Sequence, residues 1–160
     1  MAIYARALPQ VYGYLLPRCG NAALAEDLTA ETFMAAVAAT RRAAAPEVTV
    51  AWLVGVARHK LVDHWRRVAR EERRLAAVEQ AGEGLDDPWE ARLDADAAHA
   101  ALARLSAPQR IALTLRYLDG LPVADVAEHL GRSLHANETL LVRARAAFRR
   151  VYEEGETDDA

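Results

Sequence analysis

The spacing of apolar residues predicts a chain that is helical almost throughout. Apolar positions recur every three or four residues, whereas runs of β-branched residues are nearly absent and Gly and Pro are sparse. We therefore expect an all-α fold. The predicted helices span residues 3–18, 22–42, 49–75, 89–105, 107–118, 122–130 and 133–152. If Pro9 interrupts the first of these, that helix is restricted to its later part.

Residues that favour helix ends occur at the predicted boundaries. Asn21, Thr49 and Ser133 stand where a side chain caps the first turn of the following helix. Asp119–Gly120 and Gly131 stand where the preceding helix should stop. The short helix 122–130, the turn at Gly131 and the helix after Ser133 together have the spacing of a helix-turn-helix.

The last predicted helix has two distinct faces. Its apolar face carries Leu134, Leu141, Ala144 and Phe148. Asn137 falls in the same stripe, so we expect its side chain to point inward. The opposite face is centred on His135, Thr139, Val142 and Ala146 and is flanked by Ala136, Glu138, Arg143 and Arg149. A helical hairpin that only packs would have the same spacing, so spacing alone leaves DNA binding and packing as equal alternatives.

The helix predicted over 22–42 is apolar on two faces. Leu24 and Leu28 lie on one face, and Phe33 and Val37 lie on the other. Such a helix is either sandwiched in a core or offers one face to a partner, and the residues alone favour the sandwich.

The helix predicted over 49–75 combines a core stripe with a basic face. The stripe consists of Val50, Leu53, Val54, Ala57, Leu61 and Val68. On the other face, Trp52, His59 and Arg66 recur every seven residues, with Asp63 beside them. An aromatic ring among basic side chains suits single-stranded DNA, because bases stack on the ring while the cations neutralise phosphate. The alternative is that Trp52 packs against the first helix and the charges are solvated.

The charges are grouped along the chain. Residues 1–75 have a net charge of +4 (11 basic, 7 acidic) and residues 104–152 also have +4 (8 basic, 4 acidic). Residues 76–103 have −6 (1 basic, 7 acidic), and the last eight residues have −5. Turn formers, acids and a proline at 83–88 predict a linker within the acidic segment. Two basic modules joined by an acidic tether suit a chain that contacts a polyanion in two places.

Catalytic and metal-binding motifs are not found in the sequence. Its one cysteine, Cys19, excludes an internal disulfide and a cysteine-based zinc site, and is most simply a buried thiol at a helix end. The five histidines are scattered, and no H-E-x-x-H motif, Gly-rich phosphate loop or nucleophile elbow occurs. No run of about 18 apolar residues predicts a membrane span. We expect a cytoplasmic protein that is not an enzyme, needs no metal or cofactor and does not insert into membranes.

Three motifs in register resemble a known family. They are AEDLTAETF at 25–33, AWLVGVARHKLVDHWRR at 51–67 and LRYLDGLPVADVAEHLG at 115–131. Over nearly the whole chain they resemble bacterial RNA polymerase sigma factors of the extracytoplasmic-function (ECF) group, within the sigma-70 family. The resemblance implies binding to the polymerase core through the clamp of its largest subunit and the flap. It also implies recognition of promoter DNA, and control by an anti-sigma factor, which can hold such a protein near the membrane.

The resemblance assigns polymerase docking to one set of residues, and the helix faces described above supply the residues expected to make the two promoter contacts that the resemblance implies. Polymerase docking is assigned to Asp27, Leu28, Glu31 and Phe33. Contact with the minus-ten promoter element is assigned to Trp52, Arg58, His59, Lys60, Asp63, Arg66 and Arg67. Contact with the minus-thirty-five element is assigned to Arg132, Ser133, His135, Ala136, Glu138, Thr139 and Arg143. The family commonly has Lys or Arg at the positions of Glu138 and Leu140, so its base contacts do not transfer directly.

These features predict two small helical domains. They are an N-terminal helical bundle at 1–75 and a C-terminal helix-turn-helix domain at 102–152, joined by an acidic linker at 76–101 and followed by an acidic tail at 153–160 whose composition is that of a disordered segment. The alternatives to a sigma factor are a stand-alone helix-turn-helix regulator, whose N-terminal helices dimerise or sense a ligand, and a helical adaptor that binds only protein. A sigma factor needs core polymerase to bind promoter DNA well, whereas a stand-alone regulator does not.

Overall fold

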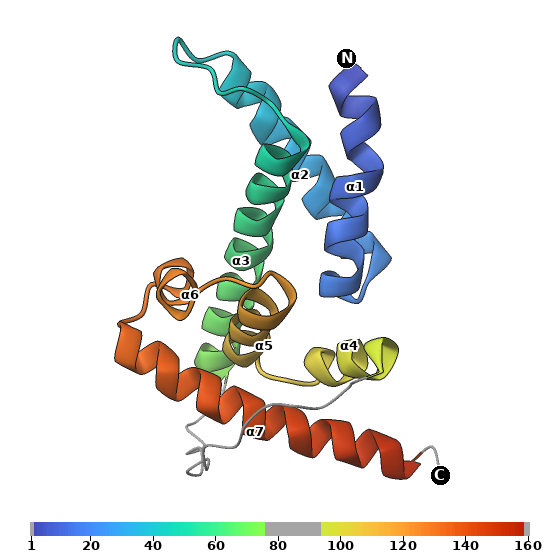
Figure 1. Ribbon diagram of the computed structural model, residues 1–160, viewed down its shortest axis with the longest axis vertical. Helices are drawn as coiled ribbons and strands as arrows, with labels where there is room; N and C mark the ends of the chain where they lie inside the picture. The colour runs from blue at the N-terminus through green and yellow to red at the C-terminus, as the bar shows by residue number, and fades with distance from the viewer. Residues whose placement is uncertain (1, 76–93, 159–160) are drawn as a thin grey trace. The chain divides into compact units, whose positions relative to one another are not determined.

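The computed structural model describes residues 2–75 and 94–158, and every regular element in those ranges is helical. The elements are α1 (Ala2–Cys19), α2 (Ala22–Thr40), α3 (Val50–Leu75), α4 (Ala95–Ala103), α5 (Ala107–Leu113), η1 (Thr114–Leu118), α6 (Val123–Leu130) and α7 (Leu134–Asp158) (Figure 1). The prediction of an all-α fold is confirmed. Contacts divide the chain into two compact units, Met1–His64 and Trp65–Ala160, so α3 begins in the first unit and ends in the second.

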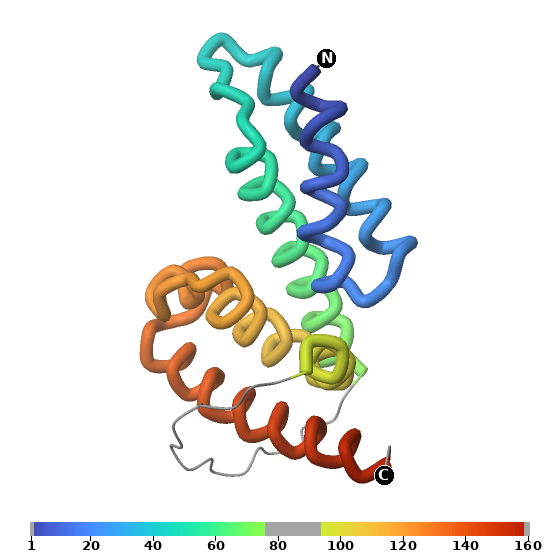
Figure 2. Tube along the Cα trace, turned by 45° about the vertical axis from the view of Figure 1, so that its right-hand side comes forward, coloured from blue at the N-terminus to red at the C-terminus, as the bar shows by residue number. Residues whose placement is uncertain are grey.

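In the first unit, α1 and α2 lie side by side and run in opposite directions (Figures 1 and 2). The predicted cap between them is confirmed, because Asn21 Oδ1 accepts a hydrogen bond from the backbone N–H of Leu24 at 3.1 Å. Thr49 caps α3 in the same way, since its Oγ1 accepts from the N–H of Trp52 at 3.1 Å. Pro9 does not interrupt α1, which is continuous to Cys19. The proline side chain is exposed, so it displaces no core contact.

The second unit packs α4, α5 and α6 against α7, and η1 packs on α5 and α6. The side chains at its centre are Ile111, Leu115, Val126, Leu141 and Phe148, all at most 3% exposed. The hydroxyl of Ser106 makes no cap bond at the start of α5. Instead, the backbone N–H of Ala107 donates to Oε2 of Glu72, from the end of α3, at 3.3 Å. The predicted stop at 119–120 is confirmed, because η1 ends there and Gly120 has a φ of 67°.

The last helix is longer than its sequence pattern predicts. α7 continues past Tyr152 to Asp158. It therefore includes six residues of the segment predicted as a disordered tail, four of which are acidic. Glu154 pairs with Arg104 at 3.3 Å, and Thr157 Oγ1 donates to the carbonyl of Glu153 at 2.7 Å. The first contact joins residues 50 positions apart, which no local pattern predicts, and the second lies within one turn of the helix. The prediction that 153–158 lacks structure is therefore wrong.

α4 begins within the segment predicted as linker (76–101) and lies inside the helix predicted over 89–105. Its first turn is capped by Asp94, whose Oδ1 accepts from the N–H of Ala97 at 2.9 Å. The N–H of Asp94 in turn donates to the hydroxyl of Tyr152 on α7 at 3.2 Å. Both views show α4 beside α7 (Figures 1 and 2). The proposed turn at 83–88 and the helix predicted from Trp89 fall, up to residue 93, outside the described residues.

Candidate nucleic-acid interface

The helix-turn-helix is formed by α6, a glycine turn and α7. Gly131 has a φ of 63°, a left-handed conformation that suits glycine and ends α6. The N–H groups of Gly131 and Arg132 donate to the carbonyls of Glu128 and Ala127, at 3.1 and 3.0 Å. Ser133 Oγ then accepts from the N–H of Ala136 at 3.1 Å and caps α7. The predicted stop at Gly131 and the predicted cap at Ser133 are both confirmed.

Asn137 holds the two helices of this motif together. Its side chain is fully buried, as the stripe on α7 predicts, and its Nδ2 donates to the carbonyl of Val123 at the start of α6, at 3.1 Å. The stripe differs from prediction at Leu134, which is 51% exposed because it lies in the first turn, before α7 meets α6. Leu140 is 9% exposed and belongs to the core. It is therefore not available for a base contact in this chain.

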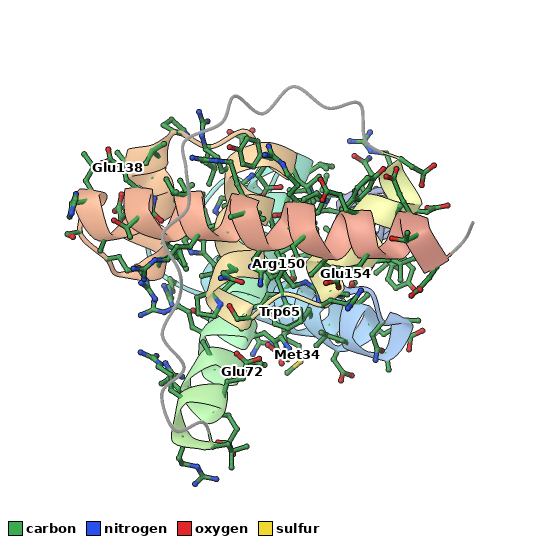
Figure 3. The ribbon with its side chains drawn as sticks, turned by 90° about the horizontal axis from the view of Figure 1, so that it is seen from below. Met34, Trp65, Glu72, Glu138, Arg150 and Glu154 are labelled. Carbon is green, nitrogen blue, oxygen red and sulfur yellow. The ribbon has the colours of Figure 1, made fainter. Side chains whose placement is uncertain are left out.

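The residues predicted to contact the minus-thirty-five element come together around the turn and the first turns of α7. Arg132, Ser133, His135, Glu138 and Arg143 are exposed, while Ala136 and Thr139 are half-buried. Glu138 lies towards the N-terminal end of α7, far along the helix from Glu154 (Figure 3). An arginine beside a helix N-terminus suits phosphate, and a carboxylate can accept from the amino group of cytosine. This face therefore offers both phosphate and base contacts.

The residues predicted to contact the minus-ten element follow α3. Four of them, His59, Asp63, Arg66 and Arg67, are exposed; the other three, Trp52, Arg58 and Lys60, are half-buried. The core stripe is confirmed at Leu53, Ala57 and Leu61, each at most 2% exposed. The remaining stripe residues, Val50, Val54 and Val68, are half-buried. Trp52 is therefore neither enclosed in the core nor fully exposed.

An apolar groove lies beside the residues predicted to dock on the polymerase. The rings of Tyr4 and Phe33 meet with centroids 5.7 Å apart and planes at 56°. Together with Met34, Val37, Ala38 and Arg41 they line a cavity of about 500 Å³. Met34 is 70% and Val37 is 40% exposed. The second apolar face of α2 is thus open, and the expectation that α2 is sandwiched is wrong.

The charged residues of the docking set do not line this groove but share a helix face with one residue that does. Asp27 and Glu31 are exposed and, one helical turn apart, share a face of α2 with Met34. Leu28 is only 1% exposed and packs inside the first unit, so its side chain holds α2 in place and does not reach a partner.

Several residues that shape these surfaces were not predicted. Met34 and Tyr4 belong to the groove. The signal for Met34 was the second apolar face of α2, whereas Tyr4 lies on α1 and had no such signal. Arg110 is 6% exposed, with its guanidinium 4.2 Å from the centre of the Trp65 ring. Figure 3 labels Trp65 and Glu72 at the end of α3. No local pattern connects residues so distant in sequence, so the contacts of Trp65 with Arg110 and of Glu72 with Ala107 had no sequence signal.

The structure also bears on three features that the sequence does not predict: a reactive cysteine, a metal site and a membrane span. Cys19 is 4% exposed at the last position of α1, which confirms the prediction of a buried thiol at a helix end. Within 2–75 and 94–158, no three His, Cys, Asp or Glu side chains gather as possible metal ligands. None of the helices in those ranges combines the length and the apolar character that a membrane span requires.

Two family models match the chain in sequence order. Sigma-70 region 2 matches residues 3–71, and Sigma-70 region 4 matches residues 95–148. The chain is also 35% identical to the ECF RNA polymerase sigma factor SigC of Mycobacterium tuberculosis, over 78% of this chain and 68% of that protein. The chain belongs to the ECF sigma factors.

Further comparisons agree with this family. This ECF sigma factor is 34% identical to the ECF RNA polymerase sigma factor BldN of Streptomyces coelicolor over 93% of its own length, but it spans only 58% of that relative. It shares its fold with the sigma factor RpoE of Bartonella quintana, solved in complex with the anti-sigma factor NepR. That match has a TM-score of 0.57 and 24% identity, and covers 94% of each chain. In the family's terms, α3 carries the end of region 2, and α6 and α7 carry the helix-turn-helix of region 4.

Proposed function

We propose that this ECF sigma factor binds RNA polymerase core and directs it to promoters by contacting their minus-thirty-five and minus-ten elements. The observation that carries the proposal is the order of two modules in one chain, region 2 at 3–71 and region 4 at 95–148. The protein acts by binding and not by catalysis. Its place of action is the cytoplasm, where the polymerase and the promoter are.

The first unit provides the contact with the polymerase clamp. The apolar groove around Phe33 and Met34 suits an apolar ridge on a partner, and the exposed carboxylates of Asp27 and Glu31 suit basic side chains beside that ridge. Leu28 supports the surface from within. The flap of the polymerase is the second docking site, for the C-terminal domain.

The promoter contacts divide between α3 and α7. The exposed and half-buried residues of α3 from Trp52 to Arg67 contact the minus-ten element, and the turn and first part of α7 from Arg132 to Arg143 contact the minus-thirty-five element. We keep 1–75 as the N-terminal domain. We extend the C-terminal domain from 102–152 to 94–158, because Asp94 and Arg104 both contact α7.

We also propose that an anti-sigma factor controls this chain. The support is the similarity in fold to RpoE of Bartonella quintana, whose structure was solved with the anti-sigma factor NepR. An anti-sigma factor acts by covering a surface that the polymerase or DNA needs, and the groove on α2 is an open apolar surface of that kind. A membrane-held anti-sigma factor would keep this chain near the membrane.

Run-off transcription with purified core polymerase on a library of genomic fragments, followed by mapping of start sites, tests the proposal. We expect a small set of start sites that share one minus-thirty-five and one minus-ten sequence. A parallel gel-shift assay should show a shift of those fragments with chain and core together and little shift with the chain alone. A strong shift with the chain alone, without specific transcripts, would instead identify a stand-alone regulator.

A further inference from the structure

A basic cavity lies within the second unit, apart from the groove on α2. It has a volume of about 450 Å³ and is lined by four arginines, Arg66, Arg70 and Arg73 of α3 and Arg132 of the turn before α7. Ile111 and Leu130, at 2% and 9% exposed, contribute to its apolar floor. The described residues that line it include no Asp or Glu. A volume of this size matches the lower part of the range for small-molecule sites.

The three arginines of α3 form one stripe. Positions 66, 70 and 73 are separated by four and three residues, which places them on one face of a helix. Ala69, 6% exposed, lies between them on the same face and contributes to the cavity wall. Arg73 donates through Nε to the carbonyl of Ala69 at 3.4 Å, and no hydrogen bond joins its two Nη groups to a described residue.

The carboxylates of this stretch are engaged elsewhere. Glu71 pairs with Arg74 at 2.8 Å, on the part of α3 that does not line the cavity. Glu72 accepts from the N–H of Ala107 at 3.3 Å. Four guanidinium groups around one cavity repel one another unless an anion lies between them, and these two glutamates do not fill that role.

The opposite wall is the turn of the helix-turn-helix. A Cβ atom built on Gly131 would lie 3.3 Å from Nη2 of Arg66, so a side chain here would crowd that guanidinium. The backbone N–H groups of Gly131 and Arg132 are already donated to Glu128 and Ala127. An anion in the cavity must therefore be held by the arginine side chains, whose planar donors suit pairs of phosphate oxygens.

We propose that this cavity binds a small anion with two or more linked phosphates, either an inorganic polyphosphate or the phosphate chain of a nucleotide. A single phosphate pairs with one or two of the four guanidinium groups, whereas linked phosphates reach arginines on both walls. A nucleotide would in addition place its base against the apolar floor. Because Arg66 and Arg132 belong to the sets proposed for promoter contact, such a ligand and promoter DNA exclude each other here. This consequence rests on the proposed function, but the binding itself does not.

Isothermal titration calorimetry of the full chain tests the site without polymerase. The probes are inorganic tripolyphosphate, a nucleoside triphosphate without Mg²⁺ and a short DNA duplex. The test variant is Arg70→Gln with Arg73→Gln, two exposed residues outside the sets proposed for promoter contact. The matched control is Arg6→Gln with Arg74→Gln, which removes the same charge from exposed positions that do not line the cavity. Circular dichroism verifies that both variants are folded.

We expect tripolyphosphate to bind the wild-type chain and the control alike. The test variant should bind about tenfold more weakly or worse, because it loses two charge-assisted contacts. Tighter binding of the nucleotide than of tripolyphosphate identifies the nucleotide as the ligand, and the reverse identifies inorganic polyphosphate. Three results would overturn the proposal: no binding of either phosphate probe, equal weakening in the control, or binding of the DNA duplex only. Failure here leaves promoter-directed transcription untouched, so the two proposals are tested separately.

Discussion

Asn137 shows how the position of one side chain decides its role. Asn is a residue type that reads adenine in the major groove, and this one lies on the helix proposed to read DNA. Its full burial and its bond from Nδ2 to the carbonyl of Val123 give it a structural role instead. Its Oδ1 is buried without a hydrogen-bond partner among the described residues, so the side chain joins the two helices through its Nδ2 donor.

Replacing that donor tests the role of Asn137. Asn137→Asp keeps the shape but removes the N–H groups and places a carboxylate in a buried site, so we expect a loss of about 3 kcal/mol in the free energy of unfolding. Urea denaturation at neutral pH measures the loss. Glu138→Gln, at the exposed next position, should change stability by less than about 0.5 kcal/mol. Equal stability of the two variants would mean that Asn137 is not enclosed in solution.

Glu138, the next residue along α7, is exposed on the outward face of the helix, whereas Asn137 is buried. We expect Glu138→Ala to change the preferred minus-thirty-five sequence, because a carboxylate selects for a base with an amino group and loses that preference when truncated. Selection of binding sites by the holoenzyme from a randomised minus-thirty-five library measures this. An unchanged selected sequence would mean that Glu138 contacts no base.

Among the elements, α2 carries the most exposed large apolar side chain described in the first unit. Met34 is 70% exposed at the groove, so Met34→Glu should leave the fold intact. We expect binding to core polymerase to weaken by about tenfold or more, because a carboxylate must lose water in the contact. Ala23→Glu adds the same charge to α2 at an exposed position outside the groove and serves as control. Equal affinities of the two variants for core would place the docking surface elsewhere.

The half-buried Trp52 allows a separate test of the proposed contact between α3 and the minus-ten element. Trp52→Ala should reduce promoter opening by about tenfold or more, because stacking of one base on an aromatic ring contributes about 1–3 kcal/mol. Permanganate reactivity of thymines in the minus-ten region measures opening, and a gel shift measures duplex binding, which should change less. Trp52→Phe keeps an aromatic ring and should retain most of the reactivity. Normal reactivity in the alanine variant would speak against stacking.

The helices were predictable from the sequence where the information is local. Caps at Asn21, Thr49 and Ser133 and the glycine stop at Gly131 act within one turn, so each is visible in a few residues. The contact of the helical end of α7 with Arg104 was not predictable, because Arg104 lies 50 positions from Glu154. The open face of α2 was not predictable either. An apolar stripe has the same sequence pattern whether it is covered by the chain or by a partner.

At the scale of the whole molecule, the two family models divide the chain at a different place from the contacts within the chain. Sigma-70 region 2 extends to residue 71, whereas the contact units divide between His64 and Trp65. The end of α3 therefore belongs to region 2 by sequence and to the second unit by packing. Two contacts join this end of α3 to α5, the N–H of Ala107 with Glu72 and the guanidinium of Arg110 over the ring of Trp65.

A double-mutant cycle determines whether the end of α3 packs on α5 in solution. Trp65→Leu and Arg110→Met each remove one partner of the contact measured at 4.2 Å. We expect each to destabilise the chain and the pair to show a coupling of about 1 kcal/mol, as for a partly desolvated cation–π contact. Urea denaturation of the four proteins gives the coupling. If the effects add within about 0.3 kcal/mol, the end of α3 is not held by this contact. A clear coupling would mean that the contact with Arg110 holds this end of α3 on α5. Promoter DNA that binds α3 at Arg66 and Arg67 would then meet a helix whose end is already packed.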